Sequence, residues 1–287
     1  MDETDYPALY LAADGAALRE QRRYLSLIAS QYALLLCAAI FAIDFSDTPL
    51  YYAVYSFIFF LSTIALFYLA TSKPEQGWYK CRALAESIKT ATWRYMMRAA
   101  PFAAIDDSSG FQNFLREILE ANRHIGERIS GLSAEGEQVT ARMASIRQQA
   151  LNCRKRLYGE QRIQEQKSWY SNKAISNKRS FRMWIGIVCL VYAGSMASVL
   201  LRIVFPDIRY WPTEPLIVLA SSIIGWIQIK KFNELASAYT LTAHEIGIIQ
   251  SQLSGASDEA SFSDFVNEAE LAFSREHTQW VARQDAA

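Results

Sequence analysis

Four segments of the chain, each 19–23 residues long, consist almost wholly of apolar residues. They are, approximately, 25–43, 49–71, 183–203 and 211–229. A helix rises about 1.5 Å per residue, so each segment is about 30 Å long, which is the thickness of a bilayer's hydrocarbon core. Buried helices of soluble proteins usually carry a polar stripe and run about 10–14 residues, unlike these segments. The sequence therefore predicts an all-α membrane protein with four spans.

The four segments form two pairs that are far apart in the chain. Residues 44–50 join the first pair and residues 202–213 join the second, and a polar stretch of 110 residues, 73–182, lies between the pairs. Short connections make each pair a helical hairpin, so we expect two transmembrane hairpins with cytoplasmic helical extensions. The order of elements repeats, which predicts two domains, 1–130 and 131–287.

The average composition hides this pattern. The mean hydropathy of +0.01 and the formal net charge of zero are typical of a soluble protein. With 51% apolar residues the chain is not disordered, and with four Cys it is not a disulfide scaffold. Lys and Arg concentrate outside the first hairpin turn, which carries only Asp44 and Asp47. The positive-inside rule then predicts an inner (plasma) membrane protein with both termini in the cytoplasm.

The regions outside the membrane read as helices of opposite charge. We expect an amphipathic helix over 111–129, a long helix over 137–182 that continues into the third span, and helices over 230–253 and 258–284. Residues 73–182 hold 20 Lys and Arg against 11 Asp and Glu, a net of +9. Residues 232–287 hold 2 against 9, a net of −7. Opposite fields attract at short range, so we expect these two regions to dock within the chain or between subunits, the alternative being two solvated helical faces that never meet.

The sequence contains none of the common catalytic or ligand-binding motifs. Zinc-protease HExxH, hydrolase GxSxG, Walker A, dinucleotide-binding GxGxxG and EF-hand loops are all missing from it. The four Cys lack the close spacing of a zinc site. We therefore expect no catalytic residue, no metal and no cofactor. The basic residues are dispersed and mostly juxtamembrane, which favours the lipid bilayer over nucleic acid as a partner.

The polar groups inside the spans are small. Small residues let helices approach closely in lipid, and in an oligomer they could instead line a polar pathway. The candidates for span packing or pore lining are Ser62, Gly194, Ser198, Ser221, Ser222 and Gly225. Four thinly polar helices cannot enclose a water-filled pore alone, so conduction would require a homo-oligomer.

Two aromatic and basic blocks lie next to the hairpins. The first, 77–102, contains Trp78, Arg82, Trp93 and Arg94. The second, 156–179, contains Tyr158, Arg162, Gln166, Trp169, Tyr170 and Lys173. The first block resembles the SLATT family, the SMODS and SLOG-associating two-transmembrane effector domains. The second resembles a sister SLATT class, so the chain is similar to two SLATT domains in tandem.

The resemblance implies a bacterial membrane effector in nucleotide-signal-linked conflict systems used for anti-phage defence. It also implies pore formation or membrane disruption, and a nucleotide-signalling enzyme or sensor as a partner. The ten residues named in the two blocks are candidates for coupling cytoplasmic helices to the membrane interface, with static anchoring as the alternative. The competing functions are a non-conducting signalling or structural module and a small transporter.

Overall fold

The computed structural model describes residues 1–104, 108–129 and 136–285. Every regular element in these ranges is a helix, which confirms the all-α fold. The chain divides into two compact units, described separately below. Unit 1 comprises Met1–Arg22, Pro74–Trp169 and Thr242–Ala287, and unit 2 comprises Arg23–Lys73 and Tyr170–Leu241.

Unit 2 contains the four spans. Four helices are long and apolar enough to cross a membrane: α1 (Ala8–Phe41), α2 (Pro49–Ser72), α8 (Gln164–Val204) and α9 (Thr213–Lys230). Each contains the apolar segment expected from the sequence to within two residues at its loop end, since α1 ends at Phe41 and α9 begins at Thr213. Helix α2 begins with Pro49 after the N-cap Thr48, whose hydroxyl accepts from the amide of Tyr51. A proline in the first turn loses no hydrogen bond, because that amide has no partner within the helix.

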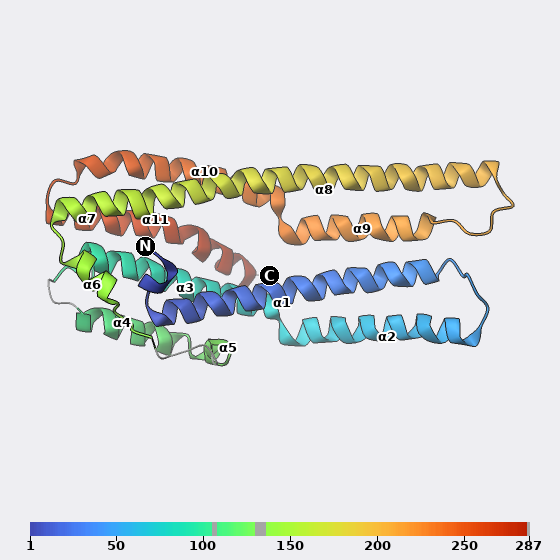
Figure 1. Ribbon diagram of the computed structural model, residues 1–287, viewed down its shortest axis with the longest axis horizontal. Helices are drawn as coiled ribbons and strands as arrows, with labels where there is room; N and C mark the ends of the chain where they lie inside the picture. The colour runs from blue at the N-terminus through green and yellow to red at the C-terminus, as the bar shows by residue number, and fades with distance from the viewer. Residues whose placement is uncertain (105–107, 130–135, 286–287) are drawn as a thin grey trace. The chain divides into compact units, whose positions relative to one another are not determined.

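Within unit 2, the two hairpins lie against each other. The rings of Phe45 and Tyr210, one from each hairpin loop, have centroids 5.2 Å apart, so both loops lie at the same end of the unit. Within the spans, the hydroxyl of Tyr32 on α1 lies against Gly225 of α9. Figure 1 shows the two hairpins, α1 with α2 and α8 with α9. A membrane containing all four spans would therefore meet both loops on one side.

A backbone feature repeats at the exit of each hairpin. Lys73, directly after α2, has φ 40° and donates its amide to the carbonyl of Leu69. Lys231, directly after α9, has φ 48° and donates its amide to the carbonyl of Ile227. A left-handed residue ends one helix and lets the next begin in a new direction. The same turn in both halves supports the architectural repeat expected from the sequence.

Unit 1 is a bundle of helices around a buried core. It contains α3 (Pro74–Met97), α4 (Ser108–Ala121), α5 (Gly126–Ile129), α6 (Ala141–Arg147), α7 (Leu151–Tyr158), most of α10 (Phe232–Gln252) and α11 (Glu259–Asp285). Helix α11 packs along α3. Three large aromatic side chains at the centre, Trp93, Phe111 and Phe262, are completely buried. Burying each stabilises the fold by about 1.5–3 kcal/mol.

Two of the helices in the structure differ from those expected from the sequence. The segment 111–129 ends its main helix at Ala121, and the segment 137–182 is not one helix but breaks between α6 and α7. Neither Pro nor Gly marks this second break. Instead, the Nε of Arg154 donates to the carbonyl of Gln149, so a side chain replaces a helical amide as donor there. From Leu151 onward the helical stretch continues through a π-helical turn into the third span, as expected.

Candidate functional site

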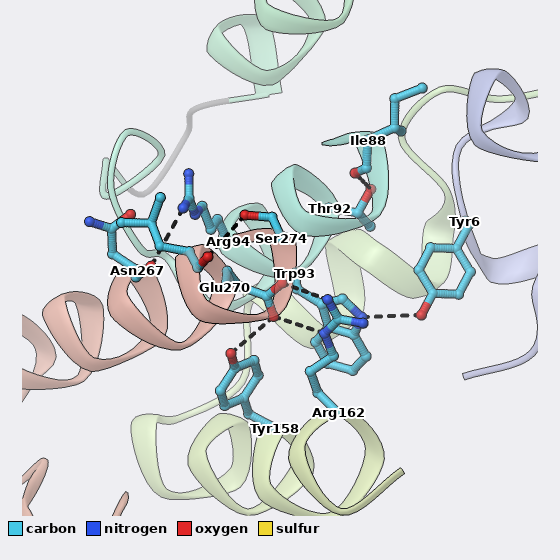
Figure 2. Close-up of polar contacts among 11 residues, drawn as sticks. Tyr6, Ile88, Thr92, Trp93, Arg94, Tyr158, Arg162, Asn267, Glu270 and Ser274 are labelled. Carbon is cyan, nitrogen blue, oxygen red and sulfur yellow. Dashed lines mark hydrogen bonds and ion pairs between the residues drawn. The ribbon is translucent and has the colours of Figure 1, made fainter. Parts of the chain in front are cut away.

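A fully buried ion pair occupies the centre of unit 1. Arg162 donates through Nε and Nη2 to the two carboxylate oxygens of Glu270, at 2.8 and 2.6 Å (Figure 2). The hydroxyl of Tyr158 donates to the same carboxylate at 3.0 Å. The side chains of Arg162 and Glu270 are 2% and 0% exposed. This two-pronged pairing is the geometry in which a guanidinium and a carboxylate interact most strongly.

Local backbone structure places these groups. Arg162 lies in the π-helical turn Gly159–Ile163, four residues after Tyr158. Residues four apart lie on one face of a helix, so both side chains point toward α11. Glu270 lies on α11, next to the apolar face with which this helix packs against α3. The turn therefore brings one phenol and one guanidinium to a single carboxylate.

Burial shapes the protonation of the cluster. Desolvation alone would lower the pKa of Arg162, but the charge and hydrogen bonds of Glu270 raise it above its usual value. Desolvation, and then the charge of Glu270, raise the pKa of Tyr158 well above its usual value. Tyr158 is therefore a neutral donor and Arg162 a permanent cation at every physiological pH.

Trp93 of α3 connects this pair to the N-terminal segment. Its indole Nε1 donates to the hydroxyl of Tyr6 at 3.1 Å, and its ring lies 5.8 Å from that of Tyr158 in an edge-on arrangement (Figure 2). The guanidinium of Arg162 lies over the Trp93 ring at 5.9 Å and over the Phe273 ring at 5.2 Å. We call Tyr6, Trp93, Tyr158, Arg162 and Glu270 the central cluster.

Two family descriptions match the chain in tandem. Residues 7–155 match SMODS and SLOG-associating 2TM effector domain 3, and residues 158–280 match SMODS and SLOG-associating 2TM effector domain 1. The chain belongs to the SLATT family. The searches of curated proteins and of solved structures found no match. The resemblance of the two aromatic and basic blocks to SLATT domains is thereby confirmed, and the chain is a multi-pass membrane protein of effector type.

The central cluster joins the two SLATT domains. Trp93 belongs to the first matched stretch, whereas Tyr158, Arg162 and Glu270 belong to the second. The expected docking of the basic central region on the acidic C-terminal region is confirmed within unit 1. Besides the central pair, Arg154 pairs with Glu259, and Lys155 donates to the carbonyl of Ala256 at 2.6 Å.

Four of the ten candidate coupling residues lie close to one another in unit 1. Trp93, Tyr158 and Arg162 are 0–2% exposed, so their immediate neighbours are protein groups. Arg94 is half-buried and donates to the carbonyl of Asn267 on α11 at 3.5 Å. The two SLATT motif blocks therefore contact each other in the core of unit 1. Coupling of this core to the spans stays a prediction.

The first block also supplies Trp78 and Arg82, near the start of α3. The ring of Trp78 stacks on that of Tyr79 with centroids 4.7 Å apart. Arg82 pairs with Asp14 of α1 at 2.7 Å and with Glu86 of its own helix at 2.5 Å. The pair between Arg82 and Asp14 holds the first turns of α3 against α1 within unit 1.

The remaining four candidates are spread along α8. Gln166 is half-buried and Trp169 is 38% exposed, both in unit 1. In unit 2, Tyr170 is buried with its ring 5.5 Å from that of Tyr239, and Lys173 is exposed. The structure does not bring these four residues into the central cluster.

Three of the six span candidates contact a neighbouring helix. Ser62 of α2 accepts from Gln31 of α1 at 2.7 Å, and Ser198 of α8 lies 2.9 Å from the hydroxyl of Thr213 on α9. Gly225 meets the hydroxyl of Tyr32. Of the other three, Gly194 and Ser221 are exposed, and Ser222 is half-buried. Packing accounts for the first three, and pore lining by any of the six stays a prediction.

Replacing Gly225 with leucine is expected to separate α1 from α9. A Cβ at this position would collide with the Tyr32 hydroxyl, whereas a Cβ at Gly194 would meet only a methyl of Leu216 at 4.0 Å. Overpacking typically costs about 1–3 kcal/mol, so Gly225→Leu should lower the melting temperature of the purified protein and Gly194→Leu should not. Equal melting of the two variants would show that the contact contributes nothing.

Three buried residues of the site were not anticipated from the sequence. Glu270 is an acidic residue on the apolar side of its helix, which is the signal that would have marked it. Arg147 donates to the carbonyls of Tyr95, Phe102 and Ala104. Arg154 donates to the carbonyl of Met97 at 2.6 Å. Both arginines satisfy carbonyls at or beyond the end of α3, where a cation also meets the negative end of the helix dipole.

Alkaline pH is expected to destabilise the protein through Tyr6. Burial, partly offset by the charge of Arg162, raises the pKa of Tyr6 from 10.0 to about 12. Below pH 10 the phenol of Tyr6 is protonated in both the folded and the unfolded protein, and its full contribution to the free energy of unfolding is present. This contribution is lost as the pH rises toward 12. Tyr6 should contribute about 2–3 kcal/mol to this loss. Tyr6→Phe should therefore show a shallower fall in unfolding free energy between pH 10 and 12, and an unchanged slope would contradict the assignment.

Proposed function

We propose that this chain is a pore-forming SLATT effector of the inner membrane, working as a homo-oligomer without catalysis in an anti-phage conflict system. The spans support this. Of the 18 most apolar consecutive residues in the helical stretch Pro49–Met97, 6% are buried, and in Thr213–Gly255 the share is 22%. A single chain thus leaves most of its span surface available to lipid and to other copies.

One span carries the observation that favours a pore. Helix α1 exposes a face of small side chains, Ser26, Ser30, Ala33 and Cys37, which repeat every three or four residues. Helix α2 instead exposes large apolar side chains, including Phe57, Phe60 and Phe67. Small and hydroxyl-bearing faces pack against helices or line water in a membrane, whereas phenylalanine suits lipid. We assign the α1 face to the conduction path and α2 to the periphery.

Charge supports the proposed orientation. The hairpin loops carry Asp44, Asp47 and Asp207 as well as Arg209, whereas the opposite ends of the spans are rich in Lys and Arg. Both termini then lie in the cytoplasm. We further propose that the trigger comes from a nucleotide-signalling enzyme or sensor that binds the cytoplasmic helices.

Thiol labelling of a conducting oligomer tests this proposal. Cys81, Cys153 and Cys189 are replaced with serine so that Cys37 is the single thiol, and the protein is reconstituted into liposomes loaded with an ion-sensitive dye. A water-soluble, charged thiol reagent should reduce ion flux at least 10-fold if Cys37 lines the path. The matched control keeps Cys189 alone, because this cysteine is also exposed within a span but lies on α8.

The outcomes separate the competing functions. Complete absence of flux, both in liposomes and in cells that express the protein together with its signalling partner, would overturn the pore and favour a non-conducting membrane module. Saturable uptake of one solute would indicate a transporter. Flux that the reagent blocks only through Cys189 would move the path from α1 to α8.

A further inference from the structure

Three exposed cations lie directly before the third span. Lys178, Arg179 and Arg182 are exposed residues of α8, and the apolar segment begins at the next residue, Met183. Among the residues that the structure describes, none is recorded as forming an ion pair with any of the three. Four helical residues rise about 6 Å, so all three cations lie within one narrow layer at the end of the span. This layer corresponds to the depth of phospholipid headgroups.

The three cations share one side of α8. At about 100° per residue, Lys178, Arg179 and Arg182 fall within roughly 100° of one another around the helix. Tyr170 and Ala174, two turns and one turn before Lys178, are buried, whereas Lys178, Arg179 and Arg182 are all exposed. Because all three side chains are exposed and lie on one side of the helix, two guanidiniums and one ammonium can reach the same ligand.

The rest of this end of unit 2 has the same charge. The basic residues here are Arg23, Lys73, Lys173, Lys178, Arg179, Arg182, Lys230 and Lys231, against the single acid Glu234. The hairpin-loop end has Arg202 and Arg209 against Asp44, Asp47, Asp207 and Glu214. The net charges of +7 and −2 make one end of the unit strongly attractive to anions.

Aromatic side chains fix the same layer at two other helix ends. The guanidinium of Arg23 lies 5.1 Å from the ring centre of Tyr68, which joins α1 to α2. The ammonium of Lys230 lies 5.8 Å from the ring centre of Trp226 on α9. Tyr and Trp favour the membrane interface, and cations beside them favour the phosphates there.

We propose that Lys178, Arg179 and Arg182 form a binding site for the phosphate headgroup of an anionic phospholipid. Guanidiniums bind phosphate oxygens through paired hydrogen bonds, and the acyl chains would lie along the apolar surface that begins at Met183. The site selects anionic over zwitterionic lipid because a phosphatidylcholine headgroup carries its own cation. This inference does not depend on conduction.

Native mass spectrometry of the full-length protein in detergent tests the site. Phosphatidylglycerol or cardiolipin should be retained at a concentration at least 10-fold lower than phosphatidylcholine. Each charge near a membrane surface contributes about 1 kcal/mol, so Arg179→Gln with Arg182→Gln should weaken retention of anionic lipid roughly 30-fold. The pair Arg179→Lys with Arg182→Lys should keep most of it.

The matched control removes two arginines from the other end of the same unit. Arg202→Gln with Arg209→Gln should leave retention of anionic lipid unchanged, because these residues follow the third span instead of preceding it. Equal retention of phosphatidylglycerol and phosphatidylcholine would overturn the site, as would equal losses in the two double variants. Displacement of the lipid by 10 mM inorganic phosphate would show a general anion site and overturn the lipid assignment. Melting temperatures of all variants report whether each remains folded.

Discussion

Replacing Glu270 with alanine is expected to lower the free energy of unfolding by about 3–5 kcal/mol, because it leaves the buried Arg162 without its counter-charge. The change removes two hydrogen bonds from the guanidinium and one from the Tyr158 hydroxyl. Denaturant unfolding of the purified full-length protein measures the loss. Glu268→Ala is the matched control, since Glu268 is an exposed carboxylate on the same helix and its removal should cost less than about 0.5 kcal/mol.

A double variant separates the value of the charge from the value of the packing. Arg162→Met with Glu270→Leu replaces the ion pair by apolar side chains of similar size and should recover most of the lost stability. Glu270→Gln keeps the shape of the side chain but not its charge. Its free energy of unfolding should therefore lie between those of the wild type and Glu270→Ala. A loss below 1 kcal/mol for Glu270→Ala would mean that water reaches Arg162 and that the central cluster is not closed.

Apolar patterning alone was sufficient to predict the membrane part of the fold. A run of about 20 apolar residues has few alternatives to a spanning helix, so the four spans and both short loops follow from residue type and length. The helices 230–253 and 258–284 were also predicted closely, because a break at Ser254–Asp258 interrupts a clear apolar periodicity. The structure places α10 and α11 within two residues of those ranges.

Tertiary hydrogen bonds explain what the sequence did not reveal. At the break between α6 and α7 Arg154 donates to the carbonyl of Gln149, and in the last turn of α3 Arg147 donates to the carbonyl of Tyr95. The bonds from Arg147 to Tyr95 and from Arg154 to Met97 join residues 52 and 57 positions apart, and no local pattern encodes them. Net charge predicted that the basic and acidic regions would dock, but it could not identify Arg162 and Glu270 among the 29 cations and 29 anions of the chain.

Replacing Trp93 with alanine is expected to cost about 3–5 kcal/mol, because a completely buried indole leaves a cavity between α3 and Tyr158. The loss should appear as a lower unfolding free energy and as faster proteolysis of unit 1. Trp93→Phe fills most of the cavity but removes the hydrogen bond to Tyr6, so its cost should be about 1 kcal/mol from that bond plus a small packing term. A cycle with Tyr6→Phe isolates the bond.

The phenylalanine variant also distinguishes a coupling role for Trp93 from an anchoring role. If the proposed pore forms and the central cluster transmits movement from the helices of unit 1 to the spans, Trp93→Phe should change ion flux at least several-fold while most of the protein stays folded. If Trp93 only holds the two SLATT domains together, flux per folded molecule should equal that of the wild type. The control is Trp169→Phe, because Trp169 belongs to the same motifs but is 38% exposed and lies outside the central cluster. Equal flux changes in both variants would contradict a specific role for the cluster, since Trp169 lies outside it.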